Sequence, residues 1–221
     1  MQIGVFLFIL KYPRGGQINS NKTGVANSIL KRTFDVFLSG IGLVISAPVW
    51  ALSSVSIVME SGGPIFIRQK RVGKDGEIFY VLKFRSMGKN THNGAAMKNR
   101  EEYNSHVTRV GKLLRATAMD ELPQLLSIFR GHMSFVGPRP FHPDVEIIGS
   151  KYRNLKEVPD FHKRVMIKPG LTGIAQIFAD KEAKTEHKVK YDLLYIKNQS
   201  FFLDVKLVLI SFYVTLFGRW E

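Results

Sequence analysis

The longest apolar stretch of the chain covers residues 34–59, FDVFLSGIGLVISAPVWALSSVSIVM, and Asp35 is its only charged residue. Its length is enough for a helix to cross a bilayer, which takes about 20 residues. Pro48 lies in its middle, and a proline inside a helix removes a hydrogen bond and clashes with the preceding turn. The pattern therefore predicts a membrane helix that bends at Pro48.

Basic residues flank this stretch on both sides: Lys31 and Arg32 precede it, and Arg68, Lys70, Arg71 and Lys74 follow it. A simple span usually has its basic flank on the cytoplasmic side only. We therefore expect a re-entrant helix that enters the membrane, bends and returns, so that both ends lie on the cytoplasmic face. A straight, kinked span is the alternative.

Two other apolar runs are shorter. Residues 3–10 are too few to span a membrane and lack the basic start and cleavage site of a signal peptide, and the polar residues 14–28 that follow are typical of a loop or linker. Residues 203–217 contain two charges, Asp204 and Lys206. They predict a helix that lies at the membrane interface or packs in the core.

A β-hairpin is predicted after the long helix. Two β-prone runs, 65–72 and 78–84, flank the tetrapeptide Gly-Lys-Asp-Gly, and Asp-Gly between such runs is a strong hairpin signal. Seven basic and two acidic residues occur from residue 68 to residue 89. This face should attract anions, and Lys83 and Arg85 are candidate ligands for a phosphate. An edge hairpin protected by solvated lysines is the alternative.

A helical pattern covers residues 107–129, and its most informative part is TAMDELPQLLSIFRG. Leucines 122, 125 and 126 and Phe129 fall on one helical face. Asp120 is placed where an N-cap belongs, and Glu121 lies in the first turn, where an acid is favoured. Capping alone explains both acids, so a reactive role for them needs support from the rest of the chain.

Three further segments complete the outline. Residues 88–108 are polar and predict a loop or short helix, 150–166 mix basic and apolar positions as a surface helix does, and 168–178 predict a Pro-Gly turn into a buried segment. The extended stretch 138–143 begins with Pro-Arg-Pro. Both prolines stiffen the backbone around Arg139, so its guanidinium could bind a phosphate at low entropic cost. A polyproline loop is the alternative.

Composition narrows the choice of partners. The 221 residues are enough for one domain, and the formal charge of +14 points to anions such as phosphates, acidic lipids or nucleic acid. There is no cysteine, so disulfides and thiolate metal sites are excluded. A nucleic-acid-binding protein would fit the charge, but it has no use for the apolar run 34–59. A membrane scaffold without activity is a third possibility.

A membrane helix, a basic hairpin, two adjacent acids and a stiffly held arginine together suit phosphoryl transfer. This reaction depends on positioning and charge neutralisation, to which arginine and Mg²⁺ contribute. Mg²⁺ usually needs only one or two protein carboxylates in addition to substrate phosphates. An aspartate can also be the nucleophile, and the helix dipole would keep Asp120 ionised for that role.

At these residues the chain resembles the bacterial sugar transferases, the monotopic phosphoglycosyl transferases. The similarity covers about residues 29–217, and its blocks are KRTFDVFLSGIGLVISAPVW, IRQKRVGKDGEIFYVLKFRSM, TRVGKLLRATAMDELPQLLSIFRGHMSFVGPRP, IKPGLTGIAQ and YDLLYI. The resemblance implies an α/β membrane-associated protein, with a re-entrant helix and a small, mostly helical cytoplasmic domain that contains a β-hairpin. We divide the chain into an N-terminal extension (1–28), the membrane helix (29–62) and the catalytic domain (63–221).

The resemblance also implies a reaction: transfer of a sugar 1-phosphate from a UDP-sugar to polyprenyl phosphate, with release of UMP, at the cytoplasmic face of the bacterial inner membrane. Asp120 would be the nucleophile, Glu121 would bind Mg²⁺ together with Asp120 or assist proton transfer, and Arg139 would bind phosphate. Arg115, Lys83 and Arg85 are further phosphate-binding candidates. Membrane lipids are expected partners, a homodimer stays open, and nucleic acid is not expected.

Two departures from the family pattern stand out. His132 replaces an acid that is common after the preceding glycine, and residues 1–28 have no counterpart. The chain resembles the short members rather than those with four additional membrane helices, so we expect regulation to come from other subunits. The identity of the sugar depends on a few hydrogen-bonding positions and cannot be assigned from one sequence.

Overall fold

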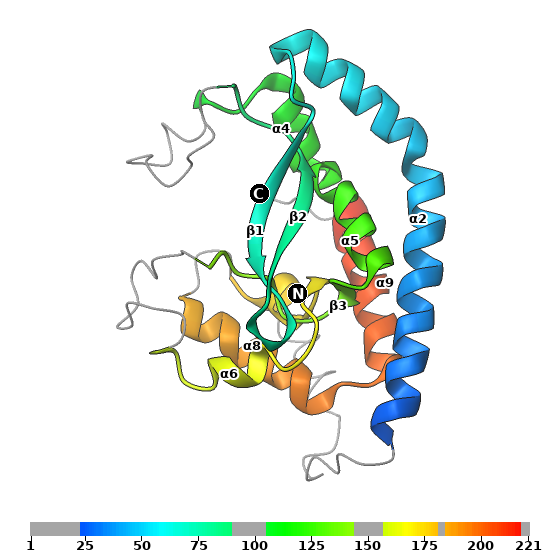
Figure 1. Ribbon diagram of the computed structural model, residues 1–221, viewed down its shortest axis with the longest axis vertical. Helices are drawn as coiled ribbons and strands as arrows, with labels where there is room; N and C mark the ends of the chain where they lie inside the picture. The colour runs from blue at the N-terminus through cyan, green and yellow to red at the C-terminus, as the bar shows by residue number, and fades with distance from the viewer. Residues whose placement is uncertain (1–22, 90–104, 144–156, 181–183, 218–221) are drawn as a thin grey trace.

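A computed structural model describes residues 23–89, 105–143, 157–180 and 184–217. The described chain is mostly helical, with two small two-stranded sheets beside a long N-terminal helix (Figure 1). The apolar run 3–10 and most of the polar segment 88–108 lie outside the described residues. The predicted mostly helical fold with a β-hairpin is confirmed, and the long apolar helix is consistent with the predicted membrane association.

Helix α2 (Thr23–Ser61) is one continuous helix with Pro48 inside it, and its axis changes direction along its length (Figure 1). It begins at Thr23, so residues 23–28 are helical and not part of the predicted loop. Within the described residues, Ser28–Ser61 is the one helical stretch long and apolar enough to cross a membrane, with a mean hydropathy of 2.0. The re-entrant path itself stays a prediction.

The basic residues before the apolar run anchor α2 to the rest of the chain. Arg32 donates from Nη1 to the carbonyl of Ile128 and from Nη2 to that of Phe129, both at 2.8 Å. Lys31 donates to the Asp204 carboxylate at 2.6 Å. Many large apolar side chains of α2 remain exposed, among them Phe37, Val44, Ile45, Leu52 and Met59.

The predicted hairpin is confirmed. Strands β1 (Phe66–Val72) and β2 (Ile78–Phe84) pair antiparallel, with Ile67 opposite Lys83. A single 3₁₀ turn, η1 (Lys74–Gly76), connects them. Asp75 and Gly76 have φ values of 57° and 82°, the left-handed region that Asp and Gly tolerate best in tight turns.

The helical pattern of 107–129 is divided into three elements: α4 (Arg109–Ala116), the 3₁₀ helix η3 (Met119–Gln124) and α5 (Leu125–Arg130). The helix start predicted at Asp120 was wrong in detail: Ala118 takes a left-handed conformation, with φ of 53°, α4 ends before it, and the acids lie in a 3₁₀ helix ahead of α5. Asp120 is therefore not an N-cap but lies inside η3. Leu125 and Ile128 of α5 pack with Val81 and Met133 in one core cluster.

Strands β3 (Ser134–Val136) and β4 (Gly170–Thr172) form a short parallel pair. Glycines allow the chain to approach closely here, since a Cβ on Gly170 would lie 2.0 Å from the Gly137 nitrogen. Helix α7 (Ile174–Phe178) follows β4 directly, and Ile174 is buried. The predicted turn into a buried segment at 168–178 is thus confirmed.

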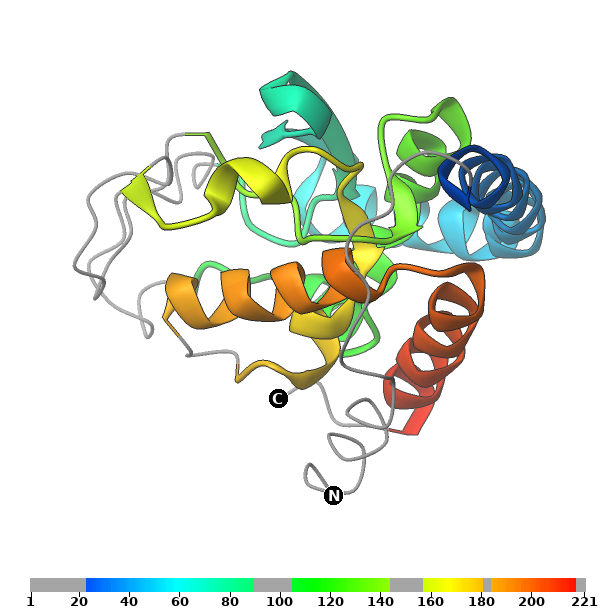
Figure 2. The ribbon, with the colours of Figure 1, turned by 90° about the horizontal axis from the view of Figure 1, so that it is seen from below.

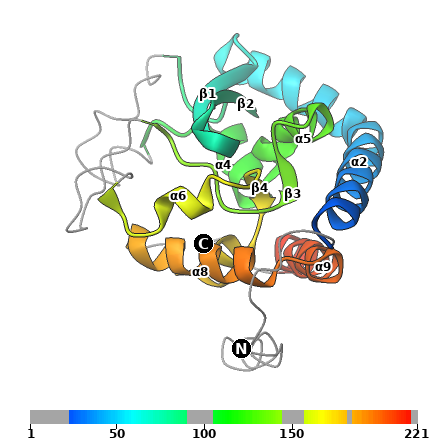
Figure 3. The same cartoon turned by 60° about the horizontal axis from the view of Figure 1, so that its bottom comes forward.

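Three helices complete the fold: α6 (Phe161–Arg164), α8 (Thr185–Asn198) and α9 (Phe201–Phe217). Figure 2 shows α8 running beneath the domain, and Figure 3 shows α2 and α9 along the same side of the molecule, where they contact each other. In its described part, the surface helix predicted for 150–166 is confirmed only as the short α6, in which His162 and Lys163 are exposed while Phe161 and Arg164 are buried.

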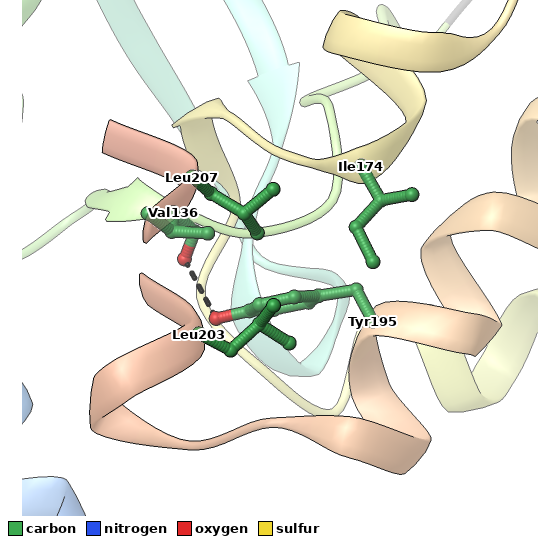
Figure 4. Packing of buried hydrophobic residues seen from close by; sticks show 5 residues of the cluster. All are labelled: Val136, Ile174, Tyr195, Leu203 and Leu207. Carbon is green, nitrogen blue, oxygen red and sulfur yellow. Dashed lines mark hydrogen bonds between the residues drawn. The ribbon is translucent and has the colours of Figure 1, made fainter. Parts of the chain in front are cut away.

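The largest apolar cluster lies between α8, α9 and the β3–α7 region. Tyr195 of α8 is 1% exposed and packs with Val136, Ile174, Leu203 and Leu207 (Figure 4). Its hydroxyl donates to the Asp204 carboxylate at 2.7 Å. This cluster fixes α9 against the strand that leads into the Pro-Arg-Pro segment.

Candidate active site

A cavity of about 610 Å³ lies between the hairpin, η3, the Pro-Arg-Pro segment, α7 and α8. Its lining includes five of the six residues predicted for the site: Lys83, Arg115, Asp120, Glu121 and Arg139. They come from four separate parts of the chain. The fold therefore brings both acids and three of the predicted cations to one cavity.

The acid pair owes its position to the break at Ala118. After this residue the chain enters η3, where the Glu121 N–H donates to the Ala118 carbonyl at 3.2 Å. Pro123 and Gln124, at the end of η3, are buried, and η3 packs closely on β2. This contact places the two carboxylates beside Lys83.

Glu121 is held as a carboxylate. Lys83 Nζ lies 2.5 Å from Glu121 Oε1. Burial raises the pKa of Glu121, but the positive charges of Lys83, Arg139 and Arg71 outweigh burial and hold the pKa below its ordinary value. Glu121 is thus a negative charge fixed within a positive cavity.

Asp120 differs from its neighbour. Burial raises the pKa of Asp120, and the charge of Glu121 raises it further, while Lys83 and Arg115 lower it only in part. The helix dipole that was expected to lower the pKa of Asp120 is missing, because no α-helix begins at this residue, and burial raises the pKa instead. Two adjacent acids with pKa values shifted apart are typical of sites where each acid has its own role.

Both predicted arginines line the cavity. Arg115, in the last turn of α4, donates from Nε to Ser86 Oγ at 2.8 Å. Arg139 is exposed, and its charge lowers the pKa values of Glu121 and Arg71. Both arginines therefore present positive charge to the cavity in which the acids lie.

Arg85 was expected among the phosphate ligands, but it does not line the cavity. It is 2% exposed and donates from Nη2 to Ser61 Oγ at 2.6 Å and to the carbonyls of Ser61 and Gly62. It stabilises the C-terminal end of α2, where carbonyls lack helical partners. Arg85 therefore contacts the end of α2 and not the cavity in which a phosphate would bind.

Among the other polar residues that line the cavity, Gln69 and Lys188 were not singled out from the sequence, and Arg71 was named only as one of the basic residues after the apolar run. Arg71 donates to Gln69 Oε1 at 2.7 Å, and its charge contributes to the low pKa of Glu121. Strand alternation could have identified this residue. Positions 67, 69 and 71 share one face of β1, and the register places Lys83 on that face opposite Ile67.

The described residues contain no group of three or more His, Cys, Asp or Glu side chains that could hold a metal ion by themselves. Asp120 and Glu121 nevertheless offer carboxylate oxygens in a cavity with many cations. Mg²⁺ is bound in proteins by one or two carboxylates together with substrate phosphates. The acid pair fits that donor set.

The sequence of the chain matches a known protein family and several of its members. The family described as bacterial sugar transferase matches residues 26–218. The chain is 36% identical over 185 residues to the exopolysaccharide production protein PSS of Rhizobium leguminosarum bv. phaseoli, covering 81% of this chain and 92% of that protein. It therefore belongs to the bacterial sugar transferase family.

Other relatives are longer. The chain is 38% identical over 190 residues to the UDP-glucose:undecaprenyl-phosphate glucose-1-phosphate transferase of Escherichia coli (strain K12), covering 84% of this chain and 40% of that protein. It is 35% identical to the UDP-N-acetylgalactosamine-undecaprenyl-phosphate N-acetylgalactosaminephosphotransferase of Aeromonas hydrophila, covering 82% and 42%. The chain thus spans about two fifths of the length of these two relatives.

Proposed function

We propose that the protein transfers a sugar 1-phosphate from a UDP-sugar to undecaprenyl phosphate and releases UMP. The observation that carries the proposal is the meeting of Asp120 and Glu121 with Lys83, Arg115 and Arg139 in one cavity. A diphosphate is an anion that such a cavity favours, and the family relatives named above act on UDP-sugars and undecaprenyl phosphate.

The reaction proceeds in two displacements at the sugar-bearing phosphorus, with Asp120 as the nucleophile of the first and the leaving group of the second. A carboxylate oxygen of Asp120 attacks the sugar-bearing phosphorus, the bond from that phosphorus to the bridging oxygen breaks, and UMP leaves with the electron pair. The phosphate oxygen of the lipid then attacks the phosphosugar-aspartate, and the Asp120 carboxylate is the leaving group. Both steps conserve charge and need no oxidant or reductant.

The surrounding residues have separate tasks. Lys83, Arg115 and Arg139 offset the charge of the phosphate oxygens, as in other phosphoryl transfers. Glu121, and Asp120 through its second oxygen, would hold Mg²⁺, which supplies further positive charge at the phosphates. The raised pKa of Asp120 means that its ionised form is weakly stabilised by the fold, which favours its use as a nucleophile over a permanent ion pair.

The membrane is the source of the acceptor. The exposed apolar side chains of α2, together with Phe202, Leu209, Phe212, Tyr213 and Phe217 of α9, offer a surface for lipid. The two helices lie along the same side of the molecule (Figure 3). We propose that α2 is re-entrant and bends at Pro48, and that the cavity opens to the cytoplasm. We place the protein in the inner membrane of a bacterium.

The test is UMP release by detergent-purified protein with Mg²⁺, over a panel of UDP-sugars, with and without undecaprenyl phosphate. We expect one donor, or a few, to release UMP with lipid present at a much higher rate than without it. No release from any UDP-sugar by folded protein supplied with lipid would contradict the proposal and favour a different donor or an inactive scaffold.

A further inference from the structure

A buried ion pair contacts the backbone of the Pro-Arg-Pro segment and is distinct from the acid pair, although Asp192 also contributes to the lining of the cavity. Arg164 of α6 and Asp192 of α8 approach to 2.5 Å, and their side chains are 3% and 2% exposed. The guanidinium also lies over the Phe141 ring, with its Cζ 3.9 Å from the ring centre. The two residues are 28 positions apart in sequence, so this contact depends entirely on the tertiary fold.

The pair holds the backbone of Arg139 from both sides. Arg164 Nη2 donates to the Arg139 carbonyl, and the Asp192 carboxylate accepts a hydrogen bond from the Arg139 N–H. Pro138 and Pro140 have no N–H, so the amide of Arg139 is the only backbone donor of the tripeptide. One ion pair therefore satisfies both the backbone N–H and the backbone carbonyl of Arg139.

We propose that Arg164 and Asp192 are positioning residues that hold Arg139 so that its guanidinium meets a phosphate of the donor in the cavity. The proposal rests on the proposed function and adds a determinant of donor binding to it. A bidentate arginine–phosphate contact depends on geometry, because the planar guanidinium must match two oxygens. A backbone fixed at both N–H and C=O supplies that geometry, while the side chain stays exposed to the cavity.

A positioning role of Arg164 and Asp192 can be separated from a purely structural one by replacing the pair with apolar residues. Buried ion pairs cost desolvation, and apolar residues of similar volume often replace them without loss of stability. The variant Arg164→Met/Asp192→Leu can therefore keep the fold while removing both contacts to Arg139. Phosphate binding then separates a positioning role from a structural one.

The experiment measures the Kd of UDP by calorimetry for the full-length protein in detergent. The variants are Arg139→Ala, Arg164→Met/Asp192→Leu and the combination of all three, with Lys163→Met as a control on the same helix, where the pair with Asp160 is exposed. We expect Arg139→Ala to weaken binding by about 10- to 100-fold, the range for hydrogen bonds to charged groups. The Arg164/Asp192 variant should lose about tenfold, and nothing further in the Arg139→Ala background.

Two results would overturn the proposal: an unchanged Kd in the folded Arg164/Asp192 variant, or losses that add fully to that of Arg139→Ala. If the apolar variant fails to fold, Asp192→Asn and Arg164→Lys replace it, and a wild-type Kd in both would have the same meaning. UDP binding without sugar-phosphate transfer by the wild type would contradict the proposed function alone. No UDP binding by the wild type would contradict both.

Discussion

Two of the lysine–carboxylate pairs in the described part of the chain have almost equal lengths but very different surroundings. Lys31 lies 2.6 Å from Asp204 between α2 and α9, and Lys83 lies 2.5 Å from Glu121 in the cavity. Asp204 accepts a second bond from the Tyr195 hydroxyl, and Lys31 also donates to the Val136 carbonyl at 2.9 Å. Tyr195 and Val136, which bind this first pair, belong to the buried cluster of Figure 4.

The Lys83–Glu121 pair is not closed in this way. Asp120 lies directly beside it, and Arg71 and Arg139 add positive charge. The Glu121 side chain is 27% exposed, against 2% for Asp204. An ion pair with all its partners satisfied joins two helices, whereas the same pair in a cavity with surplus charge is suited to bind an ion. We therefore expect the two pairs to differ in function as they differ in surroundings.

The largest effect is expected at the cavity. Asp120→Asn removes the nucleophile, and losses of a covalent nucleophile reach or exceed about 10³-fold in kcat. Its thermal unfolding should occur at the wild-type temperature or slightly above, because the fold raises the pKa of Asp120 and so disfavours its charge. UMP release and a thermal melt on the same preparation check both parts. Near-normal turnover would remove Asp120 from the reaction.

The second effect concerns the closed pair. Asp204→Ala leaves Lys31 largely buried without a counter-charge, which typically costs about 3–5 kcal/mol of unfolding free energy. Activity per folded molecule should stay close to wild type at low temperature. Chemical denaturation measures the first quantity and kinetics the second. The control, Lys163→Ala, breaks an exposed pair and should hardly change the unfolding free energy. Equal losses in the two variants would contradict the distinction drawn here.

A smaller effect is expected from the arginine in the cavity. Arg139→Ala should raise the KM for the UDP-sugar by about tenfold or more, because a charge-assisted contact to phosphate is lost. The unfolding temperature should hardly change, since the side chain is exposed. Steady-state kinetics over donor concentration provide the measurement. A KM equal to that of the wild type would exclude Arg139 from donor binding.

The smallest effect is a shift in pH dependence. Asp120 reacts as the carboxylate and its pKa is raised, so kcat/KM should rise with pH through a value above the ordinary 3.8 of an aspartate. Lys83 lowers this pKa, so Lys83→Met should move the acid limb to higher pH. Lys70→Met on the exposed side of β1 is the control and should leave the limb in place. An acid limb that stays in place in Lys83→Met would contradict the effect of Lys83 on the pKa of Asp120.

The hairpin and the acid pair could be predicted from the sequence because their signals are local. Asp75-Gly76 specified the turn, and Asp120 and Glu121 were identified from adjacent residues. An N-cap at Asp120 was expected from the sequence, but the form of the break was not, because nothing local marks Ala118 for a left-handed conformation. The positions of Arg85 and of the Arg164–Asp192 pair are set by tertiary contacts with segments far away in sequence.

The central claim is that Asp120 carries the phosphosugar between donor and lipid. Its most direct test is intact-protein mass spectrometry after incubation with the accepted UDP-sugar and Mg²⁺, without undecaprenyl phosphate. The account predicts an added mass of one sugar phosphate on the wild type, located at Asp120 by fragmentation, absent in Asp120→Asn and removed when the lipid is added. An active enzyme that shows no adduct, or an adduct that the lipid does not remove, would contradict it.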